Sequence, residues 1–115
     1  MQAICCHCSI CRKSAGAPFL MIGMWDPAKT RIVAGKTVER PTSGYLTRNR
    51  CPDCGAAIFN AVRSEKLSTN NFTLPLLAVR DEHTRPTHHI YYADRVIDIE
   101  DGLPKFDRFK WLPRA

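Results

Sequence analysis

The stretch Cys6-His7-Cys8-Ser9-Ile10-Cys11 decides how this chain folds, because it brings three thiol groups into one short segment. Cysteines this close in sequence are poor disulfide partners for one another. The C-x-C-x2-C spacing instead lets one loop present three thiolates to a metal ion. The stretch therefore predicts a metal-binding loop. Cys5, directly before it, we interpret as a small buried hydrophobic residue or a spare thiol.

The number of ligands separates two interpretations of this loop. A structural zinc site is closed by four protein ligands, whereas three ligands leave a position for water or substrate. An open position lowers the pKa of a bound thiol or water, which makes a nucleophile at neutral pH. Cys6, Cys8 and Cys11 are therefore candidate catalytic zinc ligands. The alternative is that two of them share one closed site with Cys51 and Cys54, and spacing alone favours neither.

The second cysteine pair lies in Cys51-Pro52-Asp53-Cys54-Gly55, which we call the knuckle. Two thiolates at this spacing reach one tetrahedral ion when the chain between them turns tightly. Pro52 presets φ for such a turn, and Gly55 accepts the positive φ that closes it. A redox CxxC would begin a helix in a βαβ setting, which the flanking residues do not predict. Metal ligation by Cys51 and Cys54 is the favoured interpretation.

Basic and histidine residues surround the cysteines. Arg12 and Lys13 follow the third thiol directly, and they either offset the thiolate charge or bind a substrate carboxylate. A solvated basic turn is the plain alternative. His7 lies between two predicted ligands, where it either supports them or points to solvent. His88 and His89 lie at the start of a predicted strand, and we interpret them as structural.

Apolar and alternating runs predict a mainly β chain, because no apolar pattern keeps a helical period for three turns. A hairpin turn is expected at Ala34-Gly35, and a short helix is expected only after Cys11 or near Glu65. Polar loops are expected over residues 63–71 and 81–87. The predicted strands cover residues 19–24, 30–33, 36–39, 44–48, 57–62, 72–79 and 89–93.

Length and composition suit one globular domain over residues 1–115. The net charge of +6 favours acidic small molecules or polyanions. Aromatic residues make up only 9% and do not alternate with basic ones, so nucleic-acid binding is not expected. We find neither a leader pattern nor an apolar run of the roughly 20 residues that span a bilayer, so a cytoplasmic protein without a membrane segment is expected.

Four motifs together resemble the glutathione-dependent formaldehyde-activating family, which includes the centromere-protein-V-like proteins. The match runs in order from Cys6 to Phe106, nearly the whole chain. The residues that carry it are Cys6-His7-Cys8, Cys11-Arg12-Lys13-Ser14 and Gly16-Ala17-Pro18-Phe19, then Cys51 and Cys54-Gly55, then Pro86 and His89-Ile90, and finally Asp101-Gly102-Leu103-Pro104 with Phe106.

The resemblance implies an all-β fold of twisted antiparallel sheets in a tent-like arrangement, with two zinc sites. Cys6, Cys8 and Cys11 match the catalytic site. Cys51 and Cys54 match half of the structural site, which an earlier CxC pair completes in the family. This chain has no such pair, so we expect it to lack that first strand and to bind one or two Zn²⁺. A missing edge strand leaves unpaired backbone groups, which predicts a homodimer.

The function implied by the resemblance is that of a carbon–sulfur lyase acting on a thiol–aldehyde adduct such as S-(hydroxymethyl)glutathione. The small-molecule partner is then a glutathione-like thiol, whose carboxylates would meet Arg12 and Lys13, with Arg48 or Arg50 as further candidates. The alternative is a non-enzymatic zinc module that binds a protein or a polyanion. A thiol redox switch at Cys5 and Cys6 is a third, weaker hypothesis.

Overall fold

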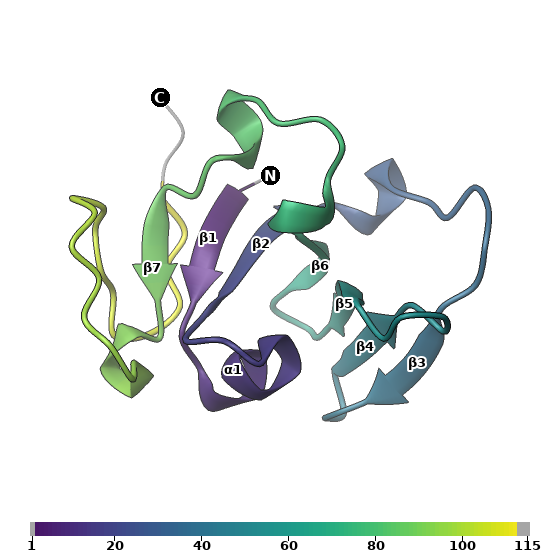
Figure 1. Cartoon of the computed structure of the whole chain (residues 1–115), viewed down its shortest axis with the longest axis horizontal. Coiled ribbons are helices and arrows are strands. Elements are labelled where there is room, and N and C mark those ends of the chain that lie inside the picture. Colours follow the sequence, from purple (N-terminus) through teal and green to yellow (C-terminus); the bar gives the residue numbers. More distant parts are fainter. Residues whose placement is uncertain (1, 113–115) are drawn as a thin grey trace.

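The computed structural model describes residues 2–112, and within them seven strands form one sheet in the order β3-β4-β5-β6-β2-β1-β7 (Figure 1). One short helix, α1 (Ser9–Ala15), connects β1 to β2. The mainly β fold expected from the sequence is confirmed. The strands are β1 (Gln2–Cys6), β2 (Leu20–Trp25), β3 (Val38–Pro41), β4 (Leu46–Arg50), β5 (Ala57–Arg63), β6 (Ser68–Thr73) and β7 (His88–Ile90).

Strand β1 lies between β2 and β7 and is buried over most of its length. It pairs antiparallel with β2, and parallel with β7, where Cys5 is opposite His89 and Cys6 opposite Ile90. The β1–β7 pair departs from the expected antiparallel pairing, as does the isolated bridge between His89 and Lys105. The β1–β7 register places Ile4 and Cys5, directly before the first cysteine motif, beside the two adjacent histidines.

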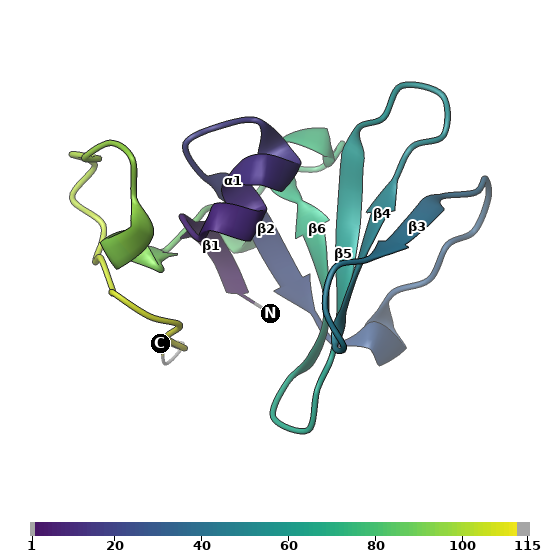
Figure 2. The ribbon, with the colours of Figure 1, turned by 90° about the horizontal axis from the view of Figure 1, so that it is seen from below.

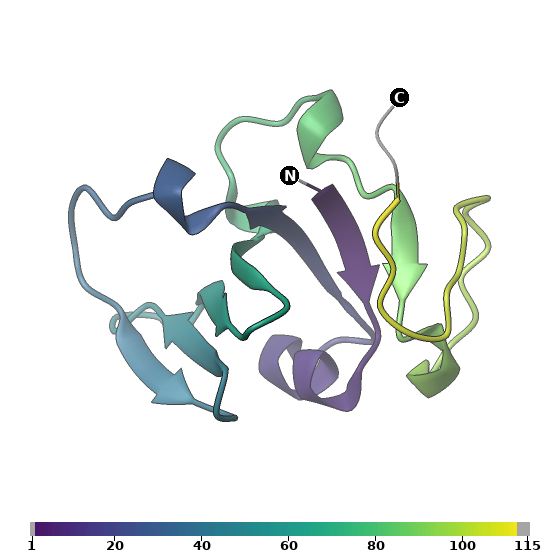
Figure 3. The ribbon, with the colours of Figure 1, turned by 180° about the vertical axis from the view of Figure 1, so that it is seen from behind.

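The two halves of the sheet converge at one end and open at the other (Figure 2). Strands β1, β2 and β7 form one half, and β3, β4 and β5 form the other, which matches the expected tent-like arrangement. Helix α1 lies in the opening between the halves in both views. Figure 3 shows the C-terminal segment beside β7, where His89 exchanges backbone hydrogen bonds with Pro104 and Phe106.

The predicted hairpin around Ala34-Gly35 is wrong. Residues 30–37 form no strand, and only Val38–Pro41 pairs, with β4 rather than with residues 30–33. Ile32 and Val33 are 57% and 81% exposed, so the apolar pattern that suggested a strand has no core to face. Alternation predicts a strand only where a neighbouring layer covers one face.

The predicted loop over residues 63–71 is also wrong in its second half, because β6 begins at Ser68 and runs between β5 and β2. Its polar side chains are buried but hydrogen-bonded: Thr69 Oγ1 donates to Asn71 Oδ1 at 2.7 Å, and Asn70 Nδ2 donates to Thr30 Oγ1 at 2.8 Å. Paired polar groups are tolerated inside a protein, which composition alone does not reveal.

Two other predicted strands are shorter than expected. Of residues 72–79, only the first two continue β6, and a 3-10 turn (Leu74–Leu76) follows at Pro75. Of residues 89–93, the strand ends at Ile90, because Tyr91 takes a left-handed φ of 51° and a 3-10 turn (Tyr92–Asp94) begins. The helix expected after Cys11 begins earlier, at Ser9, and Glu65 lies in a bend.

The core forms where β1, β2, β7 and α1 meet. Two of the candidate ligands are part of it, so the metal-binding loop is anchored directly on packed apolar side chains. The buried residues of this core are Ile4, Cys6, Cys11, Leu20, Ile22, Met24 and Ile90.

Within residues 2–112 no helix is long and apolar enough to cross a membrane.

Candidate metal centre

The thiols of Cys6, Cys8 and Cys11 converge, with all three sulfur atoms within 4.8 Å of one another. We call these residues the cysteine cluster. Cys6 ends β1, and Cys8 caps α1, where its Sγ accepts a hydrogen bond from the Cys11 N–H at 3.3 Å. A cap and the third helical residue lie on one side of a helix start, so the local fold itself brings these two sulfurs together.

Burial and hydrogen bonding shift the pKa values of the cluster thiols in different directions. Cys6 and Cys11 are buried, and Cys8 is half-buried. The pKa of Cys8 is lowered, because its sulfur accepts hydrogen bonds from the Cys11 and Cys6 thiols and from nearby backbone N–H groups. The pKa of Cys6 is raised by the same sharing of protons with Cys11 and Cys8 and by burial. The cluster therefore favours a thiolate at its most accessible position.

The donor set of the cluster fits a soft metal ion such as zinc. Sulfurs bound to tetrahedral Zn²⁺ at about 2.3 Å lie roughly 3.8 Å apart, so the observed upper limit of 4.8 Å requires only small side-chain movements. Three thiolates leave one coordination position open, as in a catalytic site. Cys6, Cys8 and Cys11 could thus hold a metal ion without refolding of the loop.

A chain of hydrogen bonds runs from the buried His7, between two residues of the cluster, to Lys105. His7 Nε2 lies 2.8 Å from His89 Nδ1, and His89 Nε2 lies 2.7 Å from Asp101 Oδ2. Lys105 Nζ donates to the other Asp101 oxygen at 2.6 Å. Both histidines are fully buried. The residue between two candidate ligands is therefore fixed by groups from the far end of the chain.

This chain of bonds assigns a tautomer to each imidazole. In the tautomer in which Nε2–H of His89 donates to the Asp101 carboxylate and Nδ1 carries no proton, that Nδ1 accepts from Nε2–H of His7. The pKa of His7 is lowered to about 4 by burial and by neighbouring positive charge, so the ring is neutral at pH 7. Its Nδ1 is then a lone-pair acceptor, and it has no hydrogen-bond partner among the described residues.

The pKa of Asp101 is lowered although its partial burial acts in the opposite direction. Hydrogen bonds from Lys105, His89 and the Leu103 N–H stabilise the carboxylate and outweigh the desolvation. Aromatic rings complete the enclosure, with Phe19 and Tyr92 each 5.0 Å from the His7 ring. The result is a wall of packed and hydrogen-bonded side chains behind the loop between Cys6 and Cys8.

The basic residues after the cluster have separate positions. Arg12 Nε donates to the backbone carbonyl of His7 at 3.1 Å, which ties α1 to the metal-binding loop. Lys13 lines a cavity on the side of α1 that faces β3 and β4. His88 lies apart from the cluster: its Nε2 donates to the Lys110 carbonyl at 2.7 Å, and its Nδ1 accepts from the Thr87 hydroxyl at 2.9 Å.

The knuckle has the turn expected of it. The Gly55 N–H donates to the Cys51 carbonyl at 2.9 Å, and Gly55 has a φ of 77°. The pKa of Cys51 is lowered, because backbone N–H groups of Cys54 and Asp53 donate to its sulfur. Cys51 is half-buried and Cys54 is exposed. Within residues 2–112 neither thiol belongs to a group of three potential ligands, so their metal binding stays a prediction.

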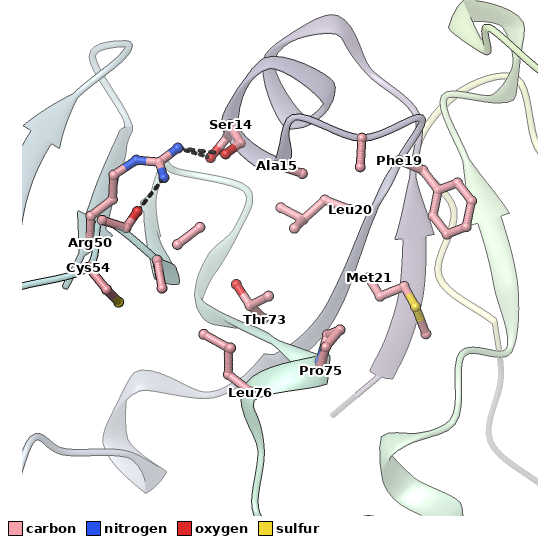
Figure 4. Close-up of a pocket in the computed structure, with 14 residues that line it drawn as sticks. Ser14, Ala15, Phe19, Leu20, Met21, Arg50, Cys54, Thr73, Pro75 and Leu76 are labelled. Atoms are coloured by element: carbon pink, nitrogen blue, oxygen red, sulfur yellow. Dashed lines mark hydrogen bonds between the residues drawn. The ribbon is translucent and has the colours of Figure 1, made fainter.

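Arginine links the knuckle to α1 across a cavity of about 420 Å³ (Figure 4). Arg50 Nη1 donates to the Gly55 carbonyl at 2.8 Å, and Nη2 donates to the Ser14 carbonyl at 2.6 Å. Opposite these groups the cavity is walled by apolar side chains, among them Leu20 and Leu76. Cys54 therefore lies at the rim of an apolar hollow rather than beside the cysteine cluster.

Sequence reasoning missed two residues of the site. Asp101 anchors the buried hydrogen bonds, and the motif Asp101-Gly102-Leu103-Pro104 was the signal that could have identified it. Tyr91 packs against the core beside the cluster. The pKa of Tyr91 is raised by burial and by the nearby charges of Cys6 and Cys8. Its left-handed φ gave no signal in the sequence, because it depends on the turn after β7.

A comparison with known proteins gave a family match for most of the chain. The sequence model of one family, described as glutathione-dependent formaldehyde-activating enzyme, matches residues 1–94. That range includes the cysteine cluster, the knuckle and His89, and it ends before Asp101. A search of the curated proteins gave no match.

Proposed function

The chain belongs to the glutathione-dependent formaldehyde-activating enzyme family, and on this premise we propose that it is a zinc-dependent enzyme of the carbon–sulfur lyase type. Its substrate would be the adduct of an aldehyde with a small thiol, such as S-(hydroxymethyl)glutathione. The observation that carries the proposal is the convergence of three thiols. Their sulfur atoms all lie within 4.8 Å of one another, and one of the three residues, Cys8, is only half-buried.

The proposed reaction joins or separates one carbon–sulfur bond. In the forward direction the thiol sulfur bonds to the aldehyde carbon, and the thiol proton ends on the former carbonyl oxygen as a hydroxyl. Zinc held by Cys6, Cys8 and Cys11 would lower the pKa of the substrate thiol. Since the aldehyde is small, most of the remaining rate enhancement would come from holding the two reactants together.

The protein side chains contribute position and charge. The peptide between Cys6 and Cys8 is held by the Arg12 hydrogen bond to the His7 carbonyl and by the buried contact of His7 with His89. Arg12 and Lys13 remain our candidates for contacts with substrate carboxylates. A site held this rigidly loses little free energy to reorganisation when the substrate binds.

We also propose a cellular location and an oligomeric state for the protein. Free thiols persist in a reducing compartment, so a cytoplasmic location suits a chemistry that uses a small thiol. Self-association is supported by β3, an edge strand whose four residues are all exposed. A dimer mass by light scattering at micromolar concentration would support the homodimer, and a monomer mass would reject it.

The activity is tested by mixing the zinc-loaded protein with glutathione and formaldehyde and following the adduct by NMR exchange spectroscopy. We expect interconversion faster than in buffer, lost in Cys8→Ala and retained in Cys5→Ala, since the latter thiol is buried outside the cluster. A rate equal to that in buffer would reject this substrate. Zinc binding with no turnover of any thiol would favour the non-enzymatic module.

A further inference from the structure

A second cavity, of about 400 Å³, lies between α1 and the strands β3 and β4. Four cationic side chains line it, and no acidic side chain does. We call it the arginine cavity; Lys13, Arg40, Arg48 and Arg50 line it together with Ser14 and Thr42. None of the four cations forms an ion pair with an acidic residue among residues 2–112.

Strand pairing forces two of these cations together. Arg40 in β3 is directly opposite Arg48 in β4, and like charges at opposed positions of an antiparallel pair are destabilising. The acidic residue of β3, Glu39, is opposite Asn49 instead, so alternation along the strand turns it to the other face of the sheet. The cavity thus concentrates positive charge that no side chain of this face neutralises.

Arg48 differs from the other three cations in its burial. The residue is 5% exposed, and its Nε and Nη1 atoms are buried without a hydrogen-bond partner. The neighbouring Arg50 is the opposite case, since its guanidinium donates to two backbone carbonyls. A buried charge with unused donors is costly to maintain, and a planar guanidinium matches a carboxylate in a two-point contact.

The arginine cavity adjoins the cysteine cluster through α1, which carries Cys11 between the cavity residues Ile10 and Lys13. The cavity and the cysteine cluster therefore share α1 as a common element.

We propose that the arginine cavity binds a carboxylate of the substrate thiol, and that Arg48 is the residue that selects for it. This inference rests on the proposed function and narrows the substrate class to thiols that carry a carboxylate. The thiol would lie at the cysteine cluster while the carboxylate accepts from the unused N–H groups of Arg48.

The test compares two thiols that differ only in the carboxylate, N-acetylcysteine and N-acetylcysteine amide. The protein is loaded with Co²⁺ in place of zinc, and thiol binding is followed by the visible absorption of the metal. We expect the acid to bind about tenfold more tightly than the amide, as a charge-assisted contact predicts. Equal affinities in the unmodified protein would overturn the proposal without the need for any variant.

Variants then assign the preference to its residue. In Arg48→Gln we expect the two affinities to become equal, with the cobalt spectrum of the ligand-free protein unchanged. Arg40→Gln, at the exposed side of the cavity, should reduce the preference about threefold and provides a readout if Arg48→Gln does not fold. Arg85→Gln, an exposed arginine outside the cavity, is the matched control and should keep the full preference.

The outcomes separate this inference from the proposed function. Selective binding of the acid without adduct turnover would reject the lyase proposal and retain the arginine cavity. Turnover with equal binding of both thiols would do the reverse. Loss of cobalt from Arg48→Gln, with the preference intact in the remaining loaded fraction, would overturn the proposal, because Arg48 would then only balance the charge of the thiolates.

Discussion

The cysteine cluster and the knuckle contain the same ligand type at similar spacings, yet they differ in the structural elements that position their thiols. The cluster combines a strand end with a helix cap, so its three sulfurs converge from two elements. The knuckle comes from one turn, and its two sulfurs gain no third partner in the described chain. Cysteine spacing alone places two thiols near each other, but a site with three thiol ligands forms only where separate structural elements converge.

The two regions also differ in what lies behind them. Behind the cluster are a packed core and the buried hydrogen bonds from His7 to Asp101. Behind the knuckle is one arginine, Arg50, whose contacts are exposed or only partly buried. We therefore expect the cluster to keep its shape with or without a ligand, and the knuckle to depend on local contacts.

The largest effect is expected from His89→Ala, which breaks the support of the cluster. The change leaves His7 without its buried partner and removes the hydrogen bond to Asp101. Loss of partners for buried polar groups, together with a cavity, predicts a fall of about 3 kcal/mol in the free energy of unfolding. Urea denaturation measures it. His83→Ala, at an exposed position, should change stability by less than about 0.5 kcal/mol.

Acid should destabilise the fold through two buried histidines, His7 and His88. The pKa of His88 is lowered, chiefly by burial, and that of His7 is lowered to about 4. As pH falls below about 6.5, the unfolded chain takes up protons that the folded chain does not, so the free energy of unfolding should decrease. Denaturation between pH 7 and pH 5 measures this slope. His88→Gln should reduce it, and an unchanged slope would contradict the role of burial.

Thiol reactivity should sharpen the contrast between the two regions. Cys54 is exposed, and the pKa of its partner Cys51 is lowered by backbone N–H groups, so the knuckle should alkylate first. Cys5 should react slowly, because burial raises its pKa to about 12. We expect iodoacetamide to modify the knuckle at least tenfold faster than Cys5 and Cys6, as read by mass spectrometry of peptides. Similar rates would remove the distinction.

The smallest effect is expected from Arg50→Gln, which weakens the support of the knuckle. The variant loses the hydrogen bonds to Gly55 and Ser14, which are partly exposed, so stability should fall by only about 1 kcal/mol. Thermal unfolding measures this loss. Alkylation of Cys54 should become faster while that of Cys6 stays constant. A change at Cys6 would show that the two regions are coupled through α1.

Much of this site could be predicted from local sequence, because its ligands are local. The spacing of Cys6, Cys8 and Cys11 indicated the cluster, and Pro52 with Gly55 indicated the turn of the knuckle. The support of the cluster could not be predicted in this way. Asp101 is linked to His7 through His89 only because β7 lies parallel to β1 and the C-terminal segment covers β7, and no local pattern encodes such a long-range pairing.

The fold shows the same limit. The apolar run over residues 19–24 predicted β2 almost in full, since burial on the core decides that strand. The polar residues of β6 predicted a loop, because their hydrogen bonds form only in the folded chain. Thr69 donates to Asn71, whereas Asn70 donates to Thr30 and accepts from Arg63. Hydrophobic pattern predicts strands that bury apolar groups, and it misses strands that bury paired polar ones.

The most direct test of the central claim is the metal content of three proteins purified without chelator: the unmodified chain, Cys8→Ser and Cys51→Ser. If the cysteine cluster is the metal centre, elemental analysis will find tightly bound zinc in the unmodified protein. Cys8→Ser will lose at least one equivalent per chain, whereas Cys51→Ser will keep the zinc of the cluster. Retention of all zinc in Cys8→Ser, or a complete loss in Cys51→Ser, would contradict the account.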